Sequence, residues 1–293
     1  MLSSAFTDSF LKQLAALQIA SRRSFLGLRQ GHHVSPRKGH GIEFSQYRQY
    51  QPGDNPRLID WNTFARTDRL YVKQYHEEED LLVGTLIDSS QSMYVDDKIK
   101  TSIDMACALS YVALNQKDSV IGAVMGNVTT PVLKSLKSIN RFSSMLTTQP
   151  QELTQNISLS NQVKQVISRL KFPGIVYLIS DFLVPTNEIE ESLLALRAKN
   201  FFCHIVQILG QSDINPFPEG GTAEVVDSET LQTLSLDWNE QDQISYENKL
   251  NTEIAKLKLI SSSFGMRYSC FYQGQTNFEQ FVLKDLLASG GLI

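Results

Sequence analysis

Hydrophobic and polar positions follow two different patterns along the 293-residue chain. From residue 81 onward, short continuous apolar runs alternate with longer segments that carry apolar residues at helical spacing. Strands buried on both faces are typical of a parallel sheet covered by helices. The pattern predicts an α/β fold with a doubly wound, mostly parallel sheet. The expected strands are 81–87, 119–126, 174–180, 201–209 and 266–272, and the expected helices are 97–116, 159–170, 187–199, 240–262 and 277–289.

The first 80 residues are patterned differently. Residues 7–28 have leucines at helical spacing after a Thr-Asp start, which predicts a helix. A Gly-, Pro- and His-rich stretch follows, and then an irregular aromatic-rich segment that ends in an expected strand at 70–75. We therefore expect residues 1–80 to form an N-terminal helix with an irregular extension. Residues 81–293 are the expected α/β domain, with a hairpin-like insertion near 211–237.

Composition indicates an ordinary globular protein, with 42% hydrophobic and 20% charged residues. No apolar run approaches the roughly 18 residues that cross a membrane. The first residues also lack the cationic and apolar regions of a signal peptide. Cys107, Cys203 and Cys270 are scattered through apolar segments and look like small core residues in a reducing compartment. We expect a cytoplasmic location.

The net charge of −4 conceals one basic segment. No acidic residue occurs from Ser9 to Ile42, and the segment 22–38 forms a basic arm. Such an arm can bind nucleic acid or an anionic membrane surface. Alternatively, it lies on an acidic surface such as Glu77–Asp80 or on a partner, and the acidic net charge favours this alternative. Three histidines, His32, His33 and His40, share the loop without acidic partners, so a metal site there is not expected.

The strongest chemical motif is "LIDSSQSM" at 86–93, where Asp88, Ser90 and Ser92 follow a buried strand. A second buried strand, "GIVYLIS", is followed by Asp181. If these strands are neighbours at the point where strand order reverses, both acids lie at one ligand-binding edge of the sheet. Carboxylates and hydroxyls together suit a hard divalent cation, although Asp and Ser are also common helix caps.

These two segments resemble the von Willebrand factor A fold and its metal-ion-dependent adhesion site. The segment 39–80, with "YRQYQPGDNPRLIDWNTFAR" at its centre, looks like the hallmark of the bacterial domain-of-unknown-function 58 (DUF58) family. The resemblance implies a von Willebrand A-like domain that acts with MoxR-type AAA+ ATPases. It also implies bound Mg²⁺, or Mn²⁺ or Ca²⁺ in its place. The implied metal ligands are Asp88, Ser90, Ser92 and Asp181, and Ser158 is a candidate fifth ligand.

One position departs from the resemblance. Where the fold usually has a Thr ahead of the helix at 159–170, the chain reads "QNISLS", with Ile157 in that place. Ser158 or Thr154 is an alternative ligand, and a weak or vestigial metal site is the other alternative.

The hallmark segment offers charged pairs and an aromatic anchor. Arginine forks and carboxylates alternate within it, and we expect them either to form an internal network or to contact a partner, with the network favoured. The residues concerned are Arg48, Asp54, Arg57, Asp60, Trp61 and Arg66.

No P-loop and no Gly-x-Ser-x-Gly motif occurs in the chain, so a catalytic role is not expected. The leading hypothesis is a non-enzymatic adaptor whose metal site binds an acidic side chain of a partner. A metal-dependent hydrolase that uses the same acids is one alternative, with Ser89 or Asp181 as its candidate reactive group. Binding of anionic polymers through the basic arm is the other.

Overall fold

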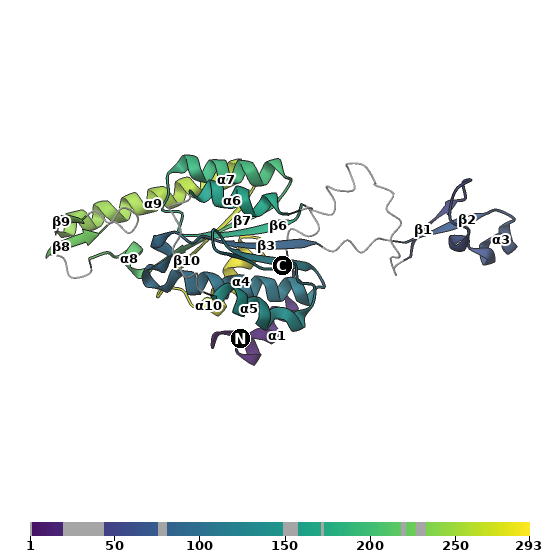
Figure 1. Ribbon diagram of the computed structural model, residues 1–293, viewed down its shortest axis with the longest axis horizontal. Coiled ribbons are helices and arrows are strands. Elements are labelled where there is room, and N and C mark those ends of the chain that lie inside the picture. Colours follow the sequence, from purple (N-terminus) through teal and green to yellow (C-terminus); the bar gives the residue numbers. More distant parts are fainter. Residues whose placement is uncertain are drawn as a thin grey trace. The chain divides into compact units, whose positions relative to one another are not determined.

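The computed structural model describes residues 2–19, 44–75, 81–148, 158–170, 173–217, 221–226 and 233–293. The chain divides into two compact units. The first, the α/β unit, contains Met1–Phe25 and Leu81–Ile293, and the second, the hallmark unit, contains Leu26–Asp80. The helix expected with the extension 1–80 therefore belongs to the α/β unit (Figure 1).

A six-stranded sheet forms the centre of the α/β unit (Figure 1). Its strands, in spatial order, are β10 (Arg267–Tyr272), β7 (Phe202–Leu209), β6 (Ile175–Ser180), β3 (Leu82–Ile87), β4 (Ser119–Val124) and β5 (Val128–Thr129). All neighbours are parallel except the short edge strand β5, which pairs antiparallel with β4. Every residue of β4 and β6 is buried, as the continuous apolar runs predict.

Helices cover both faces of this sheet. On one face the apolar residues of α6 (Leu159–Ser168) and α7 (Thr186–Ala198) pack into a core with the end of α9 (Glu240–Ser263). The other face carries α4 (Lys98–Asn115) and α5 (Ile139–Thr147). The C-terminal elements are α10 (Phe278–Gln280), η4 (Phe281–Asp285) and α11 (Leu286–Ala288), and shorter elements are η2 (Gln91–Asp97), η3 (Leu136–Ser138) and α8 (Gln211–Ile214). The described helices include none that is both long and apolar enough to cross a membrane.

Helix α5 lies in a stretch whose pattern predicts no element. The ring of Phe142 in α5 is buried against Gly122 of β4. A Cβ added to Gly122 would lie 2.5 Å from this ring. The bare backbone of Gly122 therefore makes room for the helix to approach the sheet. This contact between distant segments is invisible in the local pattern.

Helix α1 (Asp8–Ala16) is shorter than the predicted helix 7–28. Thr7 caps its start by accepting a hydrogen bond from the Phe10 N–H, but Leu17 is already extended. The next residue, Gln18, forms backbone hydrogen bonds with Ile293 at 2.6 and 2.8 Å. Pairing with the C-terminus thus ends the helix, and the part of the prediction beyond residue 19 lies outside the described residues.

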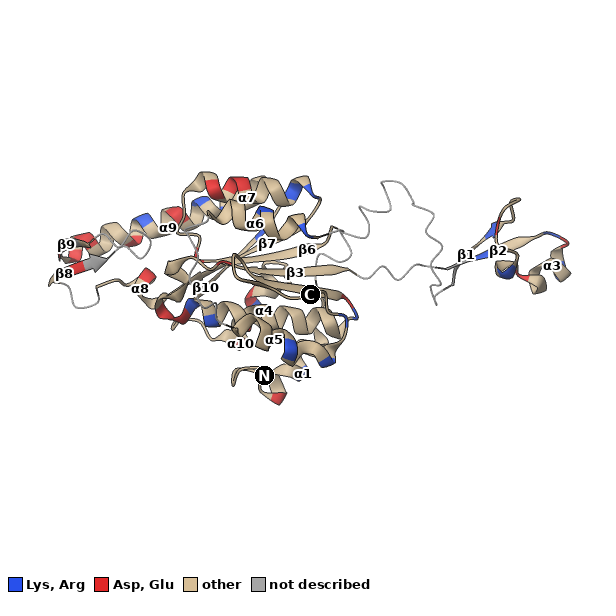
Figure 2. Ribbon diagram, in the orientation of Figure 1, with Lys and Arg blue, Asp and Glu red and all other residues tan. Residues whose placement is uncertain are grey.

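The insertion after β7 contains a hairpin followed by a long helix. Strands β8 (Gly221–Val226) and β9 (Thr233–Trp238) pair antiparallel. Helix α9 begins at an Asn239 cap, and in its 24 residues only Leu257 and Ser261 are buried. Acidic residues occur on the hairpin and in the first turns of α9, whereas the central strands carry almost no charged residues (Figure 2).

The hallmark unit is a small two-stranded sheet with short helices. Strands β1 (Phe44–Gln49) and β2 (Tyr71–Tyr75) pair antiparallel. Between them lie η1 (Pro56–Leu58) and α3 (Trp61–Thr67). Ile59 and Val72, which are both buried, pair in an isolated antiparallel β-bridge that joins the helical segment to β2.

Candidate functional site

The carboxyl ends of β3 and β6 lie side by side at the centre of the sheet. Strand β3 pairs with β4 on one side and β6 on the other, so strand order reverses there. Asp88 directly follows β3 and Asp181 directly follows β6. The backbone N–H of Asp88 donates to the Ile179 carbonyl at 2.9 Å, which joins the two strand ends. Doubly wound sheets bind their ligands at such positions.

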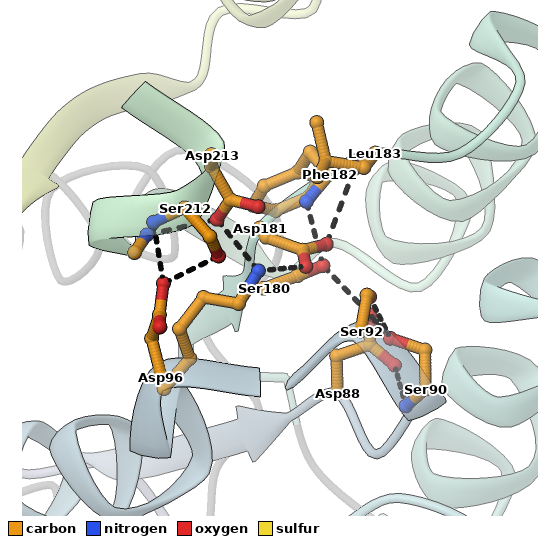
Figure 3. A network of polar contacts seen from close by, with 12 residues as sticks. Asp88, Ser90, Ser92, Asp96, Ser180, Asp181, Phe182, Leu183, Ser212 and Asp213 are labelled. Atoms are coloured by element: carbon orange, nitrogen blue, oxygen red, sulfur yellow. Dashed lines mark hydrogen bonds and ion pairs between the residues drawn. The ribbon is translucent and has the colours of Figure 1, made fainter. Parts of the chain in front are cut away.

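Hydroxyl groups surround the carboxylate of Asp88 (Figure 3), whose residue is only 1% exposed. Its Oδ1 accepts from the Ser90 N–H at 3.0 Å, and its Oδ2 accepts from the Ser90 hydroxyl at 3.1 Å. The Ser180 hydroxyl donates to the same Oδ2 at 2.7 Å. Ser92 lies one step further out, with its Oγ 3.1 Å from the Oγ of Ser90. We call Asp88, Ser90 and Ser92 the Asp88 cup.

The electrostatics of Asp88 favour an added positive charge. Burial raises the pKa of Asp88, hydrogen bonds from Ser180 and Ser90 partly oppose this, and the nearby charge of Asp181 raises the pKa further. In the described part of the chain, the groups that bond this carboxylate are hydroxyls and a backbone N–H, none of which is charged. Asp88 is therefore a buried carboxyl group without a cationic partner among these residues.

Asp181, in contrast, is ion-paired with a buried lysine. The Nζ of Lys98 lies 2.8 Å from Asp181 Oδ2 and 2.6 Å from Asp213 Oδ2. Burial by itself would lower the pKa of Lys98, but the two carboxylates outweigh burial and raise it. The second acid of the expected metal site thus already has a cation beside it.

Further contacts tie this ion pair to surrounding loops. Asp213 Oδ2 also accepts from the Gly210 N–H at 2.8 Å, and the Asp213 carbonyl accepts from the Tyr246 hydroxyl at 2.8 Å. The Asp96 carboxylate accepts from the Ser212 N–H at 2.7 Å and from its hydroxyl at 2.6 Å (Figure 3). The network connects η2, α8 and α9 at the carboxyl edge of the sheet.

Buried charge is concentrated at this edge. In the described part of the α/β unit, the buried Asp, Glu, Lys and Arg residues are Asp88, Lys98, Asp118 and Asp181. Only Asp118 lies elsewhere, since it precedes β4 and accepts from the Leu81 N–H. Because buried charges cost free energy, their gathering at one strand edge marks that edge as the candidate site.

Ser158, the fifth expected ligand, is not joined to the Asp88 cup. It precedes α6, and its Oγ lies 3.4 Å from the Oγ of Ser160. Ile157, which stands where the resemblance expects a Thr, and the alternative Thr154 lie outside the described residues. Within the described ranges, no three His, Cys, Asp or Glu side chains form a cluster suited to a metal ion. The oxygen atoms of the Asp88 cup are those of one carboxylate and two serine hydroxyls.

In the hallmark unit, Asp60 organises the start of α3. Its carboxylate caps the N–H groups of Asn62 at 3.0 Å and Thr63 at 3.3 Å, and it accepts from the Tyr47 hydroxyl at 2.7 Å. The Nζ of Lys73 lies 3.5 Å away. The Tyr47 hydrogen bond, with those from Thr63 and Asn62, holds the pKa of Asp60 well below its usual range. Asp60 is a structural cap here.

Of the remaining hallmark residues, Arg48, Asp54 and Arg66 make contacts within the unit. Arg48 pairs with Asp54 at 2.7 Å, and Arg66 donates from Nε to the Asn62 carbonyl at 3.2 Å. Arg57 lies exposed in η1. Trp61 is 59% exposed in the seven-residue helix α3, and its expected role of anchoring the segment to the sheet stays a prediction. The basic arm 22–38 and Glu77–Asp80 lie outside the described residues.

Sequence reasoning missed Ser180, Lys98 and Asp213. Ser180 precedes Asp181 and binds Asp88 from the neighbouring strand. Asp213 follows the end of β7, which is parallel to β6, so the rule that identified Asp181 would also have nominated Asp213. Lys98 carried no such signal, since a lysine at the start of a helix normally lies in solvent.

The fold and site together define an α/β protein with a polar site at the carboxyl edge of a mostly parallel sheet. Residues 46–254 match the family described as "Protein of unknown function DUF58", and the chain belongs to this family. Relatives include the uncharacterized proteins Mb1516 of Mycobacterium bovis and Rv1480 of Mycobacterium tuberculosis. Each is 26% identical over 237 residues, which cover 76% of this chain and 73% of the relative.

Two solved structures from Bacteroides are among those similar to this chain. The conserved hypothetical protein BatB from Bacteroides thetaiotaomicron has a TM-score of 0.41 and 13% identity, over 71% of this chain and 98% of its own. An aerotolerance-related membrane protein from Bacteroides fragilis has a TM-score of 0.41 and 11% identity, over 72% and 98%.

Proposed function

We propose that this chain is a non-enzymatic adaptor that binds a partner protein at the Asp88 cup. The observation that carries the proposal is that Asp88 is buried yet bonded only by neutral donors among the described residues. An unpaired buried charge is unfavourable, and a ligand that brings positive charge relieves it. The position of the cup where strand order reverses supports the same conclusion.

A divalent cation of the Mg²⁺ type fits the chemistry of the cup, and Mn²⁺ or Ca²⁺ also takes oxygen ligands. Asp88, Ser90 and Ser92 would hold the ion through one carboxylate and two hydroxyls. When bound, the ion would offer a coordination position to an acidic side chain of the partner. Asp181 is engaged by Lys98 and Ser158 is not bonded to the cup, so we assign neither as a ligand.

The resemblance to von Willebrand A-like domains supports a MoxR-type AAA+ ATPase as the partner, or a client protein that such an ATPase remodels. Protein remodelling or complex maturation in the cytoplasm is the corresponding process. Binding through one acidic side chain suits such a role, because charge contacts favour specificity and rapid encounter over high affinity.

The groups that a hydrolase would need are engaged elsewhere. The Ser89 hydroxyl donates to the Met125 carbonyl at 2.5 Å, and Asp181 is ion-paired with Lys98. A nucleophile or general base must be within reach of the reacting atom and in the right protonation state. We therefore favour binding over catalysis at this site.

The test is the affinity of the purified chain for a purified MoxR-type ATPase from the same organism, without nucleotide, in Mg²⁺ and in EDTA. We expect Asp88→Asn to weaken Mg²⁺-dependent binding about tenfold or more. The matched control is Asp285→Asn, which removes the same charge from an exposed position and should leave binding unchanged. The proposal fails if Asp88→Asn binds as the wild type does in both conditions.

A further inference from the structure

The position of Lys98 is not explained by local structure. It is the first residue of α4, where the helix dipole disfavours a positive side chain, and it is 0% exposed. Moving an ammonium group out of water costs free energy even after the protein relaxes. The two carboxylates of Asp181 and Asp213 are what compensate this cost. Lys98 is therefore placed by the tertiary charge pattern of the carboxyl edge.

Both carboxylate oxygens and the backbone carbonyl of Asp181 accept hydrogen bonds from the protein. Its Oδ2 accepts from Lys98, its Oδ1 accepts from the Leu183 N–H at 3.2 Å, and its carbonyl accepts from Gln207 Nε2 at 2.8 Å. A metal ion that bound Oδ2 of Asp181 would have to displace the ammonium group of Lys98, which is held in place by its own helix. The displaced charge would then remain buried beside the incoming cation, and like charges repel strongly in such surroundings.

We propose that Lys98 is a built-in cation that replaces a metal ion at Asp181 and leaves a one-carboxylate cation site at Asp88. This inference rests on the proposed function and adds what limits the affinity of its site. Lys98 weakens binding of divalent cations by withholding the second carboxylate and by placing a positive charge nearby. A partner that supplies an acidic side chain restores the missing negative charge, so that metal and partner bind cooperatively.

The test removes one positive and one negative side chain together, so that the net charge of the site does not change. The double variant Lys98→Met with Asp213→Asn removes one positive and one negative group and frees Asp181. Calorimetric titration should show Mn²⁺ and Mg²⁺ binding about tenfold tighter than in the wild type, because a second carboxylate joins the site. Mg²⁺ should also raise the thermal unfolding midpoint of this variant more than that of the wild type. Adding Asp181→Asn should abolish both gains.

A second variant covers the case in which the first does not fold. Lys98→Met with Asp181→Asn removes the two partners of one buried ion pair together, which proteins tolerate better than removal of one. Because Asp181 is not a ligand in our proposal, cation affinity should stay within about threefold of the wild type. Loss of binding in a folded protein would make Asp181 a ligand and overturn the inference.

The outcomes separate this inference from the proposed function. If the wild type binds and the Lys98→Met, Asp213→Asn variant binds no tighter, the lysine inference is wrong and the adaptor proposal stands. If the wild type binds neither Mn²⁺ nor Mg²⁺ but the Lys98→Met, Asp213→Asn variant does, Lys98 blocks the site. The metal-dependent part of the adaptor proposal is then wrong. If neither protein binds Mn²⁺ or Mg²⁺, both are overturned.

Discussion

Asp88 and Asp181 occupy equivalent positions on adjacent strands, yet their environments are opposite. Each follows the last residue of a buried parallel strand, and each is almost fully buried. Asp88 is bonded by hydroxyls and a backbone N–H, whereas Asp181 is paired with the ammonium group of Lys98. The same strand-end position thus supports a binding cup on one side and an ion pair on the other.

The difference assigns separate roles to the two sides. The Lys98 side joins α4, β6 and α8, so its contribution is to hold the loops of this edge in place. The Asp88 side carries a raised pKa and no cationic partner among the described residues, so it can respond to a ligand. Substitutions on the Lys98 side should therefore change stability, and substitutions on the Asp88 side should change metal and partner binding as well.

The largest effect is expected for Lys98→Met alone. Removing the ammonium group leaves the buried Asp181 and the partly buried Asp213 uncompensated, which should lower the free energy of unfolding by about 3–5 kcal/mol. Since the pKa of Lys98 is raised in the fold, its contribution is complete below its ordinary value of 10.5 and is lost only as pH rises through the folded value. Urea unfolding at neutral pH measures the loss. A cost below about 1 kcal/mol would contradict a central role for the ion pair.

Ser180→Ala tests the contact that joins the two strand ends. Its hydroxyl donates to Asp88 at 2.7 Å and accepts from the Phe182 N–H at 2.9 Å. The substitution therefore removes a hydrogen-bond partner from two buried groups, the Asp88 carboxylate and the Phe182 N–H. We expect a loss of about 2–3 kcal/mol in urea unfolding. Ser168→Ala is the control, because its exposed hydroxyl bonds only the local Gln165 carbonyl. Equal losses in both variants would remove Ser180 from the site.

In the absence of metal, Asp88→Asn should raise the free energy of unfolding, whereas the substitutions above lower it. The pKa of Asp88 is raised above 3.8 in the fold, so the folded protein holds the proton more tightly than the unfolded chain. Stability therefore falls as pH rises from 3.8 through the folded value, and the variant lacks this loss. At neutral pH in EDTA, the free energy of unfolding of Asp88→Asn should equal that of the wild type or exceed it by up to ~1 kcal/mol. The difference should fade as pH approaches 4, whereas a variant less stable than wild type throughout would indicate an unseen cation beside Asp88.

Ser92→Ala should give the smallest change in stability. Its Oγ contacts only the Oγ of Ser90 in the cup, and the residue is partly exposed. We expect a loss of about 0.5–1 kcal/mol, the usual contribution of one neutral hydrogen bond. Its effect on Mn²⁺ affinity, measured by calorimetry, should be larger than its effect on unfolding. An unchanged affinity would place Ser92 outside the cation site.

The sequence by itself determined the framework of the α/β unit. Continuous apolar runs predicted the five long strands, and helical spacing predicted α4, α6, α7 and α9 to within a few residues. The position of Asp88 and Asp181 after two such strands predicted a polar edge, because parallel strands end on the same side. These features are local or follow from strand direction, so a pattern along the chain is enough to reveal them.

Only the tertiary structure decided how the two acids differ. Lys98 lies 83 positions from Asp181 and 115 positions from Asp213 along the chain, yet its ammonium group bonds both carboxylates. Ser180 reaches Asp88 across 92 positions, and Phe142 fits against Gly122 in a stretch without a clear pattern. A carboxylate in a sequence has no fixed partner. Whether it meets a lysine, a hydroxyl or a ligand depends on which strands and loops the folded chain brings beside it, and that choice set the chemistry of this site.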